Sequence, residues 1–84
     1  MNKNKISVLG GGSWGTVLAY LASLNGNEVT LWMRDEEVAK EINNTKINSR
    51  YLPNLTLGSN LTATTEISDI SDSGIIIFCI PSDA

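Results

Sequence analysis

Three glycines, Gly10, Gly12 and Gly15, are spaced so that the chain around them could bind a phosphate group. The N–H groups at the start of a helix donate hydrogen bonds to anions, and this needs no charged side chain. Gly10 would allow a tight turn, Gly12 would let the backbone approach a pyrophosphate, and Gly15 would let the helix pack closely against a sheet. The pattern therefore predicts dinucleotide binding, provided that a strand precedes it and a helix follows it.

A strand and an amphipathic helix are expected on the two sides of this glycine turn. Residues 6–9 form a short apolar run that is typical of a buried strand. Apolar residues then recur at spacings of three and four, which puts them on one face of a helix: Trp14, Val17, Leu18, Leu21 and Leu24. The helix should end at Asn25-Gly26, because these residue types accept the left-handed conformation. Without such flanking elements, the glycines would indicate a turn and nothing more.

The next residues predict a second strand at 28–32, which completes a βαβ unit, and a second helix at 34–42. Asp35 can cap this helix, and the two glutamates after it favour the positive end of the helix dipole. Val38 and Ile42, four residues apart, give the helix a narrow apolar stripe.

The rest of the chain predicts two more strands. We expect an irregular connection at 43–60, a strand at 61–65 and a short helix at 66–72. A further strand at 74–80 and the start of a helix at 82–84 should follow. A connection as long as the first of these often covers a site. Ile67 and Ile70 are the apolar residues of the short helix. The strand at 74–80 is apolar throughout, so it should be buried on both faces.

These elements predict an α/β fold: the N-terminal part of a Rossmann-type, doubly wound parallel sheet with the strand order 3-2-1-4. Strand four would then lie beside strand one, so the crevice in which such sheets bind ligands would be present already. We expect residues 1–84 to be one incomplete dinucleotide-binding domain, without a catalytic or substrate domain.

Composition and charge exclude several kinds of protein. The formal net charge is −3 and the six basic residues are scattered, which argues against a nucleic-acid partner. Apolar runs are too short for a membrane span. Cys79 is the only cysteine and the chain has no histidine, so we expect a small core residue and no metal site. The lack of a cysteine pair fits a cytoplasmic protein.

Four motifs occur in a specific order and spacing. They are Lys5-Ile-Ser-Val-Leu-Gly-Gly-Gly-Ser-Trp-Gly-Thr16, Leu31-Trp-Met-Arg-Asp35, Arg50-Tyr-Leu-Pro53 and Ile80-Pro-Ser82. Together they resemble the N-terminus of bacterial NAD(P)-dependent glycerol-3-phosphate dehydrogenase, over essentially the whole chain. The resemblance implies an oxidoreductase that interconverts dihydroxyacetone phosphate and sn-glycerol 3-phosphate by hydride transfer, for phospholipid synthesis.

The resemblance also implies which residues bind the cofactor. Those expected to hold the pyrophosphate and its flanking riboses are Gly10, Gly12, Ser13, Trp14 and Gly15. Arg34 would lie near the adenosine 2′ position, Tyr51 would close over the cofactor, and Pro81-Ser82 would lie toward the nicotinamide. No catalytic residue is expected here, because the lysines that the family uses for proton transfer and phosphate binding have no counterparts in this chain.

Simpler roles compete with three of these assignments. Trp14 could be the first core residue of its helix, Arg34 a solvated charge beside Asp35, and Tyr51 an anchor for its loop. The choice between NADP and NAD also stays open. Arg34, after the non-acidic Met33, favours the 2′-phosphate of NADP, whereas Asp35 could contact the 2′-hydroxyl of NAD. Met33 could also crowd the adenine pocket.

A non-catalytic NAD(H)-sensing module is the alternative function, because the regulatory domains of potassium channels share this fold. Ser13-Trp14 inside the glycine motif and the non-acidic Met33 favour the enzyme. For the full-length enzyme we expect a small-molecule substrate, dihydroxyacetone phosphate or glycerol 3-phosphate, and allow a homo-oligomer.

Overall fold

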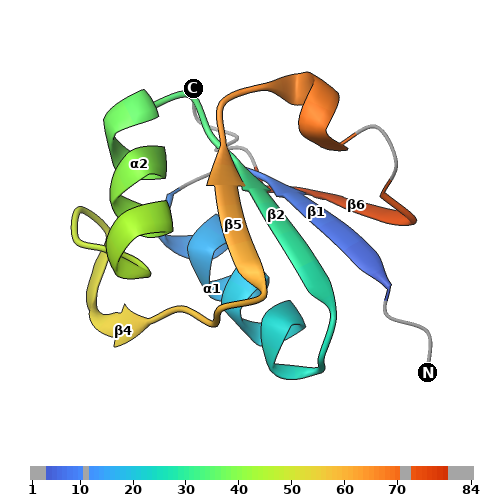
Figure 1. Cartoon of the computed structure of the whole chain (residues 1–84), viewed down its shortest axis with the longest axis horizontal. Coiled ribbons are helices and arrows are strands. Elements are labelled where there is room, and N and C mark those ends of the chain that lie inside the picture. The colour runs from blue at the N-terminus through green and yellow to red at the C-terminus, as the bar shows by residue number, and fades with distance from the viewer. Residues whose placement is uncertain (1–3, 11, 71–72, 80–84) are drawn as a thin grey trace.

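A four-stranded parallel sheet forms the centre of the computed structural model (Figure 1), which describes residues 4–10, 12–70 and 73–79. The strand order is β5-β2-β1-β6, which confirms the predicted order 3-2-1-4. In chain order these strands are β1 (Lys5–Leu9), β2 (Glu28–Trp32), β5 (Leu61–Thr64) and β6 (Ile75–Phe78). In the register of the sheet, Val8 of β1 lies between Leu31 of β2 and Ile77 of β6.

Two α-helices and one 3-10 helix connect these strands, and their starting points follow from the local sequence. Helix α1 (Ser13–Leu24) packs on β1 and β2, and helix α2 (Glu36–Thr45) packs on β5. Asp35 caps α2 as predicted, although the helix continues beyond the expected end until Lys46 takes a left-handed conformation. The predicted short helix is the 3-10 helix η1 (Ile67–Ile70).

Helix α1 turns its small residues toward the sheet, which corrects the predicted face. Its buried residues are Gly15, Thr16, Ala19 and Ser23. The large apolar residues that were predicted to face the core lie on the side of the helix away from the sheet. Among them, Trp14, Leu21 and Leu24 are exposed. Small side chains let a helix approach a sheet closely, whereas a row of tryptophan and leucine would hold it away. The helix is confirmed, and so is its end near Asn25-Gly26: Asn25 is the C-cap and Gly26 has a positive φ.

Strand β6 is also less buried than predicted. Ile75, Ile76 and Phe78 are exposed, although the strand is apolar throughout. Because β6 is the edge of this sheet, only β1 pairs with it among the described residues. The predicted helix start at 82–84 lies outside the described residues.

The connection between α2 and β5 contains more structure than predicted. A two-stranded antiparallel sheet occupies part of it, formed by β3 (Ile47–Asn48) and β4 (Leu52–Thr56). Leu57, which follows β4, is buried in the main core. Most of this core comes from apolar side chains of the sheet and of α2: Ile6, Val8, Val29, Leu31, Val38, Ala39, Ile42, Leu61 and Ala63. Ala19 of α1 and Met33, which follows β2, also belong to it. Among the described residues, no helix has the length and apolar character that crossing a membrane would require.

Candidate dinucleotide-binding site

The glycine turn connects the end of β1 to the start of α1 by two close backbone approaches. Gly10 has φ +129°, and a Cβ built there would lie 2.1 Å from the Cys79 carbonyl oxygen. A Cβ on Gly15 would lie 1.6 Å from the Gly10 carbonyl oxygen. Any side chain at either position would collide with backbone atoms, so both glycines are required by the packing of the turn.

Gly12 differs from the other two glycines, because a Cβ placed there would meet no atom of the described residues within 4 Å. Gly12 is also the N-cap of α1, and as a glycine it has no side chain with which to cap the helix. The first N–H groups of a helix need partners from outside the helix. An anion can supply these partners, so the open space beside Gly12 and the uncapped helix fit a bound pyrophosphate.

Ser13 and Trp14, the first two residues of α1, are exposed to solvent. The Trp14 side chain is 72% exposed, which rules out the alternative that it is a core residue of its helix in the structure of this chain. Its indole is therefore free to pack against a ligand or another part of the protein.

The carboxyl end of β1 lies between the carboxyl ends of its two neighbours, β2 and β6. Gly10 N–H donates to the carbonyl of Trp32, the last residue of β2, at 2.9 Å, and Cys79 N–H donates to the Leu9 carbonyl at 2.8 Å. The β1–β6 boundary is the point at which the strand order reverses, since β2 and β5 lie on the other side of β1. Parallel sheets bind ligands at such switch points.

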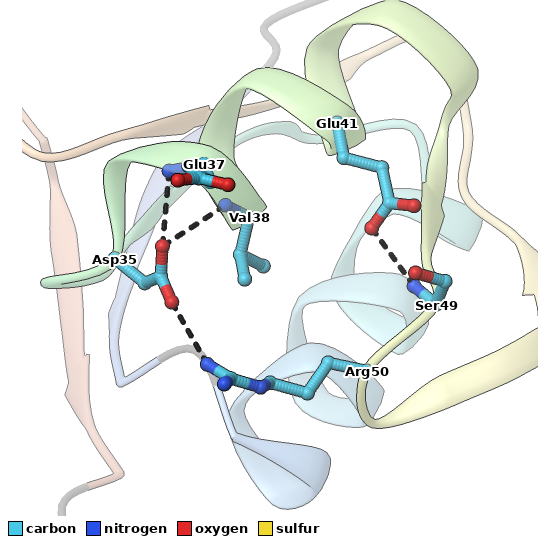
Figure 2. Close-up of polar contacts among 6 residues, drawn as sticks. All are labelled: Asp35, Glu37, Val38, Glu41, Ser49 and Arg50. Carbon is cyan, nitrogen blue, oxygen red and sulfur yellow. Dashed lines mark hydrogen bonds and ion pairs between the residues drawn. The ribbon is translucent and has the colours of Figure 1, made fainter.

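Both carboxylate oxygens of Asp35 accept hydrogen bonds within the protein (Figure 2). Its Oδ1 accepts hydrogen bonds from the Glu37 and Val38 N–H groups, with distances of 2.9 and 3.3 Å, and its Oδ2 accepts one from Arg50 Nη1 at 2.8 Å. These groups border an open pocket of about 450 Å³. Its lining residues are Asp35, Glu37, Val38, Glu41, Ser49 and Arg50.

Arg34 is exposed and, among the described residues, forms no ion pair with Asp35 or any other acid. The cation that pairs with Asp35 is Arg50. An exposed Arg34 without an ion pair fits both the predicted cofactor contact and the alternative of a solvated charge. Met33 is 3% exposed and belongs to the hydrophobic core.

Tyr51 lies in the turn between β3 and β4 and is 44% exposed. Strand β3, which precedes this turn, contacts α1 through a hydrogen bond from Asn48 to Thr16. Pro81, predicted to lie toward the nicotinamide, is outside the described residues.

Three residues near the site were not predicted: Thr16, Asn48 and Arg50. The position of Thr16, four residues after Gly12, is a signal that could have indicated a hydrogen bond to the turn. Asn48 gives no such signal, because an asparagine in a polar stretch normally predicts an exposed loop.

Comparison with known proteins places almost the whole chain in one family. The family model described as NAD-dependent glycerol-3-phosphate dehydrogenase N-terminus matches residues 5–84. The glycerol-3-phosphate dehydrogenase [NAD(P)+] of Rickettsia felis is 53% identical over 100% of this chain and 26% of the relative. That of Acinetobacter baumannii is 51% identical over 93% of this chain and 22% of the relative.

A solved structure agrees with these sequence matches. The crystal structure of glycerol-3-phosphate dehydrogenase from Coxiella burnetii has a TM-score of 0.87 and 33% identity, over 95% of this chain and 25% of that chain. The chain thus spans about a quarter of the length of the relatives that it matches.

Proposed function

Because the chain belongs to the family of NAD-dependent glycerol-3-phosphate dehydrogenase N-termini, we propose that it is the cofactor-binding part of an oxidoreductase. The reaction would interconvert dihydroxyacetone phosphate and sn-glycerol 3-phosphate, for glycerophospholipid synthesis in the cytoplasm. The observation that carries this proposal is the glycine turn. Gly12 leaves open space at an uncapped helix start, while Gly10 and Gly15 are packed against backbone.

The role of this chain would be to bind and orient the cofactor. A nicotinamide cofactor supplies the hydride, and the protein supplies binding and orientation. N–H groups at the start of α1 would hold the pyrophosphate, with Ser13 and Trp14 beside it. Tyr51 would close over the cofactor, and Pro81 would lie toward the nicotinamide. We assign no catalytic residue to these 84 residues.

NADP is the cofactor that we propose over NAD. Recognition of the NAD ribose needs a carboxylate that is free to accept a hydrogen bond from the 2′-hydroxyl. Asp35 already accepts from two backbone N–H groups and from Arg50. Arg34 is exposed beside it and has no ion-pair partner among the described residues, which supports binding of a 2′-phosphate.

A turnover assay tests the proposal on the longest open reading frame that contains this chain. We expect NADPH-dependent reduction of dihydroxyacetone phosphate, which is measured as a loss of absorbance from the reduced nicotinamide. Unphosphorylated dihydroxyacetone is the matched control substrate and should react far more slowly. The 84-residue chain alone is expected to reduce neither.

The outcomes separate the functions that the fold allows. Tight NAD(H) binding without turnover of either substrate would indicate a sensing module instead of an enzyme. If neither cofactor binds, the glycines only shape a turn, and the proposal fails.

A further inference from the structure

Two buried polar side chains connect β3 to the glycine turn. Asn48 Nδ2 donates a hydrogen bond to Thr16 Oγ1 at 3.0 Å, and Thr16 Oγ1 donates one to the Gly12 carbonyl oxygen at 2.9 Å. Both side chains belong to residues that are 0% exposed. Buried polar groups are costly unless they are hydrogen-bonded, so this arrangement has a defined geometry and resists rearrangement.

The chemistry of the two groups sets the direction of the hydrogen bonds. An amide nitrogen can only donate, and a hydroxyl has a single proton to donate. Because Thr16 Oγ1 accepts from Asn48, its own proton is available for the Gly12 carbonyl. Asn48 therefore determines which way the Thr16 hydroxyl points.

The Gly12 carbonyl in turn determines the direction of the Ser13 N–H, because the two groups share one planar peptide unit. In a trans peptide the carbonyl and the N–H point in opposite directions. The Gly12 oxygen accepts from Thr16 twice, once from Oγ1 at 2.9 Å and once from the backbone N–H at 3.0 Å. These bonds hold the oxygen toward the helix, so the Ser13 N–H points out of its N-terminal end.

We propose that Thr16 and Asn48 are positioning residues, which hold the Ser13 N–H in the orientation that binds a cofactor phosphate. This inference rests on the proposed function, because it takes the glycine turn as the phosphate site. Neither side chain touches the phosphate, since both are buried and act through the Gly12 peptide. A purely structural role would instead lower stability and leave the cofactor affinity of the folded protein unchanged.

The test compares Thr16→Val with Thr16→Ser in the longest open reading frame that contains this chain. Valine keeps the shape of threonine without the hydroxyl, and serine keeps the hydroxyl. We expect Thr16→Val to raise the Kd for NADPH by about threefold to tenfold, the effect of one neutral hydrogen bond. Thr16→Ser should bind nearly as tightly as the wild type. KM for NADPH should rise in Thr16→Val while kcat changes little, as for a loss of uniform binding.

Asn48→Leu tests the second half of the arrangement. The Thr16 hydroxyl would lose the donor that orients it, so we expect a smaller rise in Kd. The double variant Thr16→Val/Asn48→Leu should bind no more weakly than Thr16→Val alone, because both changes remove the same connection. If Thr16→Val does not fold, Thr16→Ala replaces it, since alanine favours the helix and leaves more room.

The results separate this inference from the function on which it rests. If the wild type binds NADPH and folded Thr16→Val binds it equally well, the positioning role is wrong and the proposed function stands. Equal weakening by Thr16→Ser and Thr16→Val would also overturn the inference, because the hydroxyl would then be irrelevant. If the wild type binds neither NADPH nor NADH, both proposals fail.

Discussion

Arg50 Nη1 donates a hydrogen bond to Asp35 Oδ2 at 2.8 Å and so joins the turn before β4 to the start of α2 (Figure 2). Both side chains of this ion pair are substantially exposed, Arg50 by 60% and Asp35 by 42%. Water therefore screens the attraction between them, and its contribution to stability is small. The other oxygen of Asp35 caps α2, and that interaction should contribute more.

Asp35→Ala is expected to lower the free energy of unfolding by about 1 kcal/mol, because it removes the cap and the ion pair together. Asp35→Asn should keep most of this stability, since asparagine is an equally good N-cap. Arg50→Gln removes only the exposed ion pair and should cost about 0.5 kcal/mol or less. Urea denaturation of the three variants measures these differences. A loss in Arg50→Gln as large as in Asp35→Ala would mean that the ion pair, rather than the cap, is the main contribution.

The glycine turn offers a pair of alanine substitutions with opposite expectations. Gly12→Ala should leave stability almost unchanged, because the new methyl group meets no atom of the described residues within 4 Å, but should weaken NADPH binding by about tenfold or more. Gly15→Ala should lower stability by about 3 kcal/mol or prevent folding, because its Cβ would lie 1.6 Å from the Gly10 carbonyl oxygen. Thermal unfolding and fluorescence titration with NADPH separate the two effects. Normal NADPH affinity in Gly12→Ala would argue against a phosphate beside Gly12.

The sequence was sufficient to predict most of the elements and their order in the sheet. Strand β2 was predicted with its observed bounds, and Asp35 was identified as the cap of α2. These features depend on local patterns, namely short apolar runs, capping residues and glycine. The order 3-2-1-4 then follows from the topology that βαβ units favour.

Burial was harder to predict, because it depends on which elements pack against each other. The row of apolar residues in α1 does share one face, but it is the face away from the sheet. Periodicity places residues on a common face without indicating what covers that face. Asn48 was missed for a similar reason: its burial depends on Thr16, a residue that is distant in sequence.

Arg34→Ser is expected to shift the cofactor preference toward NADH. An arginine beside a 2′-phosphate forms charge-assisted hydrogen bonds, so its loss should raise the Kd for NADPH by about tenfold or more. The Kd for NADH, which has no 2′-phosphate, should change little. Arg50→Ser is the matched control, since Arg50 is an exposed arginine that already pairs with Asp35. If Arg50→Ser alters the NADPH-to-NADH ratio as strongly as Arg34→Ser, the guanidinium that binds the phosphate has been misassigned.

The two edges of the main sheet differ in how their backbone and side chains are covered. At β5, the Asn43 side chain donates to the Ala63 carbonyl at 2.9 Å and accepts from the Ala63 N–H at 2.8 Å. Lys46 Nζ donates to the Leu61 carbonyl of the same strand at 2.9 Å. At β6, the other edge, the large Phe78 side chain is 71% exposed. Side chains from α2 and its C-cap residue therefore protect the β5 edge, whereas β6 presents apolar surface.

The 84-residue chain, produced alone, is therefore expected to self-associate through β6. An exposed apolar edge strand is a template for pairing with another chain, and a charge on it opposes that pairing. Phe78→Lys should shift the chain toward the monomer in sedimentation velocity experiments at matched concentrations. Ile67→Lys is the control, because Ile67 is an exposed isoleucine on η1 and the substitution adds the same charge. An equal shift in both variants would show that net charge, and not the β6 edge, governs the association.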